Sequence, residues 1–163
     1  MRHIISILLE IEAGALSRVS GLFSARAYNI ESLTVAPTSD PTISRITVVA
    51  QGEEQVVEQI LKQLNKLVDV LKLIDLTENE HFEREIMLIK IEPSGSQIDG
   101  LAAVIEEVNA RKLEEVGDVI TLEVTDNGLK LNETLEKLKS FNVLEVVRSG
   151  AVGIGSGHTL LKI

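Results

Sequence analysis

The same order of apolar patterns occurs twice along the 163 residues of the chain, and this repeat restricts the possible folds more than any other feature. In the first half, Ile4 to Leu9 is an apolar run of strand length, and apolar residues recur at helical spacing from Gly14 onward. Two β-branched runs, Ile30 to Val35 and Ile43 to Ala50, flank a segment with turn chemistry and predict a hairpin. A second helical stripe and a strand from Val70 to Leu76 complete this unit.

This order, strand–helix–strand–strand–helix–strand, is that of the ferredoxin-like sandwich, in which two helices cover one face of a four-stranded sheet. The pattern starts again with a strand at Ile86 to Ile91 and ends with another at Val143 to Val147. We therefore predict an α+β fold made of two ferredoxin-like βαββαβ sandwiches in tandem, residues 1–77 and 85–163, joined by a polar linker, 78–84. A short Gly-rich tail, which we expect to be flexible, ends the second sandwich.

Composition excludes several classes of function. The formal net charge is −9 without a Lys/Arg cluster, which argues against nucleic-acid binding, and aromatic residues make up only 2%. The absence of cysteine excludes disulfides, thiol nucleophiles and Cys-based metal sites. Because the N-terminal apolar run is too short for a signal peptide or a membrane span, we expect a cytoplasmic protein without a membrane partner.

The titratable residues form no catalytic or metal-binding pattern. His3, His81 and His158 lie near the N-terminus, in the predicted linker and in the tail, and we expect all three at the surface. Paired glutamates such as Glu53-Glu54 are typical of solvated helix ends. The sequence therefore predicts neither a metal site nor a catalytic residue.

The start of the first predicted helix lacks a capping side chain. Gly14 occupies the place where Ser, Thr, Asp or Asn usually caps the helix, so the N–H groups of Gly14, Ala15 and Leu16 are left for water or for a ligand carboxylate. Asn29 follows the far end of this helix. Both residues also have a plain structural explanation, because Gly is an acceptable N-cap and Asn tolerates the left-handed conformation after a helix. The pattern thus allows an amino-acid site without requiring one.

Several longer sequence motifs of this chain resemble those of a known protein family. The run "GLFSARAYNIESLTV" is similar to a signature of the N-terminal ACT domain in the small, regulatory subunit of acetolactate synthase (acetohydroxyacid synthase). The segments "EQILKQLNKLVDVLKLIDL" and "EREIMLIKI" continue this resemblance, and "GDVITLEVT" and "LEVVRSGAVGI" match it more loosely in the second half. The resemblance covers nearly the whole chain, and it is strong to about residue 92.

The resemblance implies a chain that is not an enzyme on its own. A small subunit of this family activates a large catalytic subunit, a transferase that converts pyruvate to 2-acetolactate in the synthesis of valine, leucine and isoleucine, and makes it subject to feedback inhibition by valine. Thiamine diphosphate, Mg and FAD are expected on the catalytic subunit, and no cofactor is expected in this chain.

The resemblance also implies a site for valine or a related branched-chain amino acid between the paired ACT domains of a homodimer. Backbone N–H groups around Gly14 would hold the effector carboxylate, and the Asn29 amide with the backbone near Ile30 would complete the polar contacts. The effector-binding residues would be Ile11, Glu12, Ala13, Gly14, Ala15, Leu16, Asn29 and Ile30. On the second helix, Gln59 would contact the catalytic subunit.

Two positions depart from the family pattern. Ile11 stands where the family usually has Asn, and its side chain cannot form a hydrogen bond with the effector. Ala27 stands where Gly often precedes the aromatic residue and Asn29. We therefore expect weakened valine feedback in this protein.

Two other functions fit the pattern less well. One is a free-standing ACT sensor of amino acids that controls another enzyme or a regulator. The other is an independent enzyme on a ferredoxin-like sandwich. The "YNIESLTV" motif and the lack of a DNA-binding segment favour a regulatory subunit over the first, and the lack of a catalytic set argues against the second.

Overall fold

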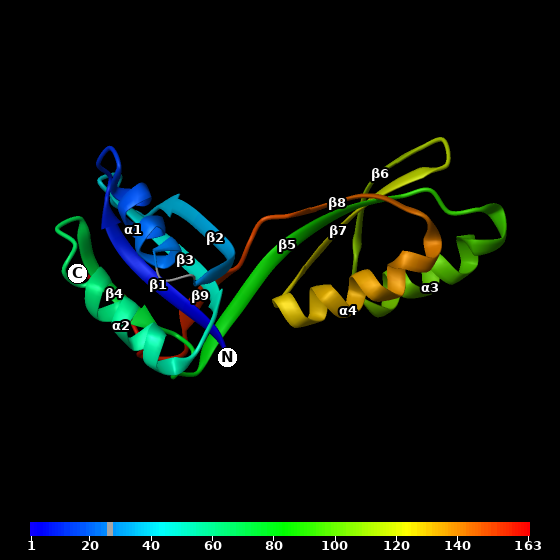
Figure 1. The fold of residues 1–163 in the computed structure, drawn as a ribbon. Helices are drawn as coiled ribbons and strands as arrows, with labels where there is room; N and C mark the ends of the chain where they lie inside the picture. Colours follow the sequence, from blue (N-terminus) through cyan, green and yellow to red (C-terminus); the bar gives the residue numbers. More distant parts are fainter. Residues whose placement is uncertain (26–27) are drawn as a thin grey trace. The chain divides into compact units, whose positions relative to one another are not determined.

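A computed structural model describes residues 1–25 and 28–163 and contains two compact units (Figure 1). The first unit consists of residues 1–82 and 151–163, and the second of residues 83–150. Each unit has an antiparallel sheet with two helices against one face, which confirms the predicted α+β fold of two ferredoxin-like sandwiches.

In the first unit, the sheet has the strand order β2-β3-β1-β4, so that β1 and β3 are central. The elements of this unit are, in chain order, β1 (Arg2–Glu10), α1 (Ala15–Ser24), β2 (Asn29–Pro37), β3 (Ile43–Gln51), α2 (Glu54–Leu64) and β4 (Val70–Asp75). The predicted strands and helices are present here, each longer or shorter by only a few residues.

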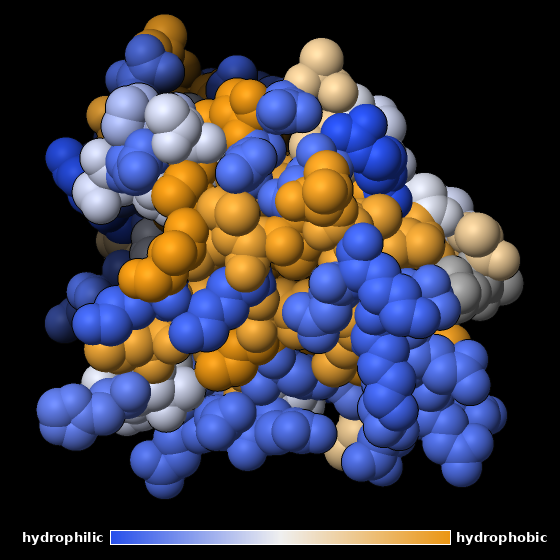
Figure 2. All heavy atoms as spheres, turned by 90° about the vertical axis from the view of Figure 1, so that its left-hand side faces the viewer, coloured by the Kyte–Doolittle hydropathy of each residue, from blue (hydrophilic) through white to orange (hydrophobic). Residues whose placement is uncertain are grey.

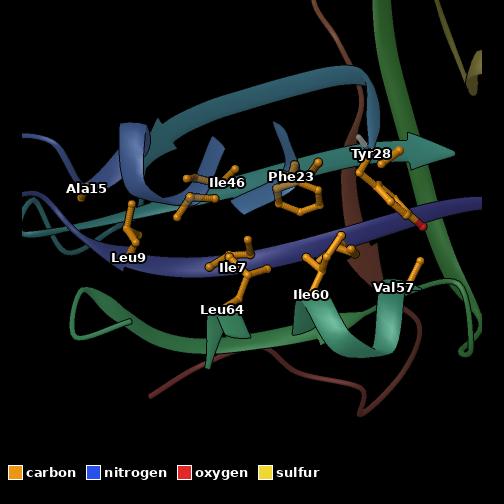
Figure 3. Close-up of a cluster of buried hydrophobic side chains, with 13 residues drawn as sticks. Ile7, Leu9, Ala15, Phe23, Tyr28, Ile46, Val57, Ile60 and Leu64 are labelled. Atoms are coloured by element: carbon orange, nitrogen blue, oxygen red, sulfur yellow. The ribbon is translucent and has the colours of Figure 1, made fainter. Parts of the chain in front are cut away.

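Alternate side chains of β1 fill the main core of this unit. Ile5, Ile7 and Leu9 point to the face that α1 and α2 cover, because successive residues of a strand face opposite sides of the sheet. Phe23 of α1 and Ile60 of α2 meet them there (Figure 3). The core is aliphatic apart from the pair Phe23 and Tyr28, as the scarcity of aromatic residues requires.

The opposite face of the same sheet is covered by the C-terminal segment. Ile4, Val49 and Leu76 form a second buried cluster on this face together with Ala151. The strand β9 (Val152–Gly155) follows, and Arg45 donates a hydrogen bond to its Gly153 carbonyl oxygen at 2.8 Å. The expectation of a flexible tail was therefore wrong, because apolar side chains on the helix-free face need a cover and small residues let a backbone approach them closely.

The structure also divides the chain differently from the predicted boundaries. Residues 151–163 group with the first unit rather than with 85–163, and the predicted linker 78–84 runs into a strand, since β5 begins at His81. Glu85 is buried in this strand, and Arg148 binds its two carboxylate oxygens at 3.0 and 2.7 Å. A charged residue can thus lie buried within a regular strand, because its carboxylate has a partner.

The second unit repeats the architecture with the strand order β6-β7-β5-β8. Met87, Ile89 and Ile91 of β5 alternate with exposed residues and pack against Leu101 and Leu131 of its two helices. The elements of this unit are β5 (His81–Ile91), the short helix η1 (Gly95–Gln97), α3 (Ile98–Glu107), β6 (Arg111–Val116), β7 (Val119–Asp126), α4 (Gly128–Leu138), the short helix η2 (Lys139–Phe141) and β8 (Val143–Arg148).

The packing of the C-terminal segment predicts the effect of a single methyl group. A Cβ atom at Gly153 would lie 2.7 Å from Leu76 Cδ1 and 2.9 Å from Ile4 Cδ1, so Gly153→Ala should destabilise the first unit by about 1–3 kcal/mol through overpacking. In α1, by contrast, a Cβ atom at Gly21 would have no atom within 4 Å. Gly21→Ala should therefore stabilise the chain by about 0.5–1 kcal/mol. Thermal unfolding measures both, and an unfolding temperature of Gly153→Ala at or above that of the wild type would contradict this packing.

Candidate functional site

The loop between β1 and α1, residues 11–14, has a defined backbone. The Ile11 N–H donates to the carbonyl oxygen of Thr42 at 3.0 Å, and the Glu12 N–H donates to that of Glu10 at 3.0 Å. Gly14 has φ +85°, in the left-handed region that side chains other than Asn and Asp rarely adopt. Glycine is therefore favoured at this position for conformational reasons, apart from any need for a ligand to approach.

Helix α1 begins without a side-chain cap. The N–H groups of Gly14, Leu16 and Ser17 donate to no acceptor within residues 1–25 and 28–163, whereas the Ala15 N–H donates to the Glu12 carbonyl oxygen at 3.2 Å. The expectation of free donors thus holds for Gly14 and Leu16 but is wrong for Ala15, whose N–H closes the loop. The remaining N–H groups point away from the helix at its positive end, where an anion is stabilised.

An ion pair holds a guanidinium group beside this helix start. Arg18, one turn into α1, donates from its Nε to the Asp69 carboxylate at 2.6 Å, and Asp69 is almost fully buried while Arg18 is half exposed. The Arg18 guanidinium lies beside Gly14, since a Cβ atom at Gly14 would be 3.2 Å from one of its terminal nitrogens. The hydrogen bond from Arg18 holds the pKa of Asp69 below its ordinary value.

Neither member of this pair is among the residues predicted for the site. The spacing from Gly14 to Arg18 is four residues, which places a side chain on the same side of a helix one turn later, so Arg18 could have been found from the sequence. Asp69 could not, because it lies 51 residues further along the chain and reaches the site only through the packing of the sheet.

Apolar side chains remain exposed around the loop. Ile11 is 55% exposed and Leu16 is 42% exposed, although both are large hydrophobic residues. Figure 2 shows a group of apolar side chains, surrounded by hydrophilic ones, on the side of the first unit that faces left in Figure 1. Glu12 and Ala13 are exposed as well. A small ligand with one carboxylate and an aliphatic part would find both kinds of partner here.

Asn29 and Ile30 lie at the other end of the sheet. Asn29 is opposite Gln51 on β3, which is opposite Arg2 at the start of β1, whereas the loop leaves β1 after Glu10. Eight residue steps at about 3.3 Å each separate Arg2 from Glu10 along the strand, a distance of about 26 Å. One copy of the chain therefore does not bring Asn29 to Gly14.

The other predicted positions have varied surroundings. Gln59 is exposed on α2, and Ala27 lies outside the described residues. His158 is exposed, but the expectation of a surface position was wrong for His3, which is 4% exposed and lies 3.3 Å from the Asp75 carboxylate. Within the described residues, His, Asp and Glu side chains form no group arranged to bind a metal ion.

Comparisons of the chain with known proteins all indicate the same protein family. Residues 5–72 match a family model described as an AHAS small subunit-like ACT domain, and residues 84–157 match a model described as the small subunit of acetolactate synthase. The chain is 47% identical over 163 residues to the acetolactate synthase isozyme 3 small subunit of Escherichia coli K12, covering 99% of this chain and 100% of that protein. It is 48% identical over 159 residues to the acetolactate synthase small subunit of Haemophilus influenzae, covering 97% and 98%.

A solved structure agrees over the same length. The crystal structure of the acetolactate synthase small subunit from Thermotoga maritima superposes with a TM-score of 0.86 at 28% identity, covering 97% of this chain and 99% of that one. None of the helices among the described residues is both long and apolar enough to cross a membrane.

The ion pair at the site predicts a pH dependence of stability. Because Arg18 lowers the pKa of Asp69 in the folded chain, the pair stabilises the fold at neutral pH, and this contribution disappears as the pH falls below 3.8, the ordinary pKa, through the lower folded value. Asp69→Asn should therefore lower the free energy of unfolding at pH 7, and the difference from the wild type should shrink in strong acid. Denaturant titrations from pH 7 to strong acid measure it.

Asp118→Asn provides the matched control, since Asp118 is exposed and makes no hydrogen bond or ion pair with the described chain. This variant should follow the wild type across the same pH range. A constant difference between Asp69→Asn and the wild type at all pH values would contradict the assigned role of the ion pair.

Proposed function

Because the chain belongs to the family of acetolactate synthase small subunits, we propose that it is the regulatory subunit that activates the thiamine-diphosphate-dependent catalytic subunit and mediates valine feedback inhibition in branched-chain amino acid synthesis. The observation that carries the regulatory part is the uncapped start of α1 beside Gly14 and Arg18. The chain performs no chemistry itself and acts in the cytoplasm. Thiamine diphosphate, Mg and FAD belong to the catalytic subunit in this proposal.

The effector is an aliphatic amino acid, in the first place valine. Its carboxylate accepts hydrogen bonds from the free N–H groups of Gly14 and Leu16 and is attracted by the Arg18 guanidinium. Its side chain lies against the exposed apolar surface of Ile11 and Leu16. Burying an isopropyl group in this way contributes about 1.5–3 kcal/mol.

The second half of the site comes from another copy of the chain. β2 is an edge strand, and an edge strand offers unpaired backbone groups to a neighbouring strand. If two copies pair antiparallel through β2, the start of one β2 lies beside the end of the other. Pro37, at that end, is opposite Ser44, which is opposite Leu9 near the end of β1. Asn29 of the second copy then reaches the loop of the first.

This arrangement explains how an effector acts on a distant enzyme. An amino acid that contacts both copies stabilises one arrangement of the dimer, and the catalytic subunit responds to that arrangement. A ligand shifts such an equilibrium only by its differential affinity for the two states, typically about 1–3 kcal/mol. Gln59, exposed on α2, is a contact for the catalytic subunit in this proposal.

Reconstitution tests both activation and the effector site. The isolated chain should produce no acetolactate from pyruvate, but it should stimulate the catalytic subunit, and valine should reduce this stimulated rate. Gly14→Asp places a carboxylate at the anion site and should abolish the valine response while activation remains. Gly14→Asn tolerates the same left-handed backbone without the charge and should retain more of the response. Equal valine inhibition in the wild type and in Gly14→Asp would refute the site.

Mixed dimers test whether the site is shared between copies. Gly14→Asp and Asn29→Ala chains each lose valine binding alone, but a mixed dimer contains one site with the intact loop of one chain and the intact Asn29 of the other. Valine binding should therefore return at half the stoichiometry in mixed dimers. No recovery on mixing would contradict a shared site.

The residue at position 11 predicts the strength of the feedback. Ile11 lacks a side-chain hydrogen bond to the effector, which costs on the order of 1.5–3 kcal/mol, or roughly ten- to a hundredfold in affinity. Ile11→Asn should tighten valine binding by that factor in a calorimetric titration, whereas Ile11→Val should leave it nearly unchanged. Tight binding by the wild type, unaltered in Ile11→Asn, would contradict this interpretation.

A further inference from the structure

The start of β2, where Asn29 lies, is held in place by the residue before it. Tyr28 is 7% exposed and belongs to the main core of the first unit, in the same cluster as Phe23 and Val57 (Figure 3). Its ring centroid lies 6.1 Å from that of Phe23, and its N–H donates to the Phe23 carbonyl oxygen at 3.0 Å. Asn29 itself is exposed, so its position depends on the burial of its neighbour.

The ring of Tyr28 lies directly against the backbone of Gly52. A Cβ atom at Gly52 would be 2.1 Å from Tyr28 Cε2 and 2.4 Å from Tyr28 Cζ, closer than such atoms approach in proteins. Gly52 does not have a positive φ, so glycine is needed here for space and not for its backbone conformation. Gly52 directly follows Gln51, which is opposite Asn29 in the sheet. The contact thus lies beside the start of β2.

Neither side of this contact can move away easily. The Gly52 N–H donates to the Met1 carbonyl oxygen at 2.9 Å, which ties this backbone to the chain ahead of β1. The ring atoms of Tyr28 belong to a rigid aromatic group inside a packed core. A side chain at position 52 would therefore displace Tyr28, and the displacement would reach Asn29 through one planar peptide unit.

We propose that Gly52 and Tyr28 are positioning residues of the effector site. The backbone of Gly52 leaves space for the Tyr28 ring, and the buried ring fixes Asn29 for its contact with the effector. This inference rests on the proposed function, because Asn29 binds the ligand only in the shared site. Gly14 and Gly52 then serve opposite halves of that site, the loop of one copy and the β2 start of the other.

NMR spectra of the full-length chain without a ligand test the positioning step by itself. Gly52→Ala should shift the side-chain amide signals of Asn29. Gly21→Ala is the matched control, since a Cβ atom at Gly21 would have no atom within 4 Å, and it should leave these signals in place. Unchanged Asn29 signals in Gly52→Ala would overturn the proposal.

Valine binding measures the consequence for the site. Gly52→Ala and Tyr28→Leu should each weaken binding by about tenfold or more, the factor lost with one hydrogen bond to a charged group. Tyr28→Phe should bind within about twofold of the wild type, because the Tyr28 hydroxyl has no hydrogen-bond partner within the described residues. Tyr28→Leu adds no atoms and carries the test if Gly52→Ala does not fold. Equal valine binding in Tyr28→Leu and the wild type would overturn the proposal.

Mixed dimers separate this role from a general loss of stability. Gly52→Ala should regain valine binding at half the stoichiometry when mixed with Gly14→Asp, because one site then combines an intact loop with a correctly placed Asn29. It should regain none when mixed with Asn29→Ala, because both chains lack the same half of the site. Recovery with Asn29→Ala, or with neither chain, would overturn the proposal.

The proposed function fails separately from this inference. If Gly14→Asp and Asn29→Ala do not restore valine binding to each other, the shared site is refuted. The NMR comparison of the ligand-free chains still decides whether Gly52 positions Asn29.

Discussion

The need to cover both faces of β1 governs the first unit. Residues His3 to Leu9 are all buried, so apolar side chains project from both sides of the central strand. The two helices cover one side, and the segment that begins at Ala151 covers the other. Without this second cover, Ile4, Val49 and Leu76 would face water. The return of the chain to its first unit is thus a consequence of one strand being apolar on both faces.

The same strand sets the position of the proposed effector site. The loop with Gly14 follows one end of β1, where the uncapped start of α1 and the Arg18 guanidinium suit a carboxylate. The other end of β1 holds His3, which is buried against Asp75, so the two ends of one strand have different polar surroundings.

The strand register also explains why the proposed effector site needs two copies of the chain. Asn29 begins an edge strand at the end of the sheet that is distant from the loop, so in this proposal antiparallel pairing with another copy brings the two together. The proposed effector would then contribute its binding energy to the arrangement of the two copies. Arg18 and Asp69 stabilise the loop side of the proposed site within each copy, so that the helix start is in place before a ligand binds.

The alternation of strands and helices, the aliphatic core, the uncapped helix at Gly14 and the family motifs could all be predicted, because they depend on residues close together in the chain. The partner of Arg18, the burial of His3 against Asp75 and the role of the C-terminal segment became apparent only in the folded chain. Asp69, Asp75 and Gly153 lie 51, 72 and 108 residues from the side chains they meet, Arg18, His3 and Arg45. Local periodicity carries no information about such pairs, and a glycine-rich segment has the composition of a flexible tail until the apolar face that it covers is known.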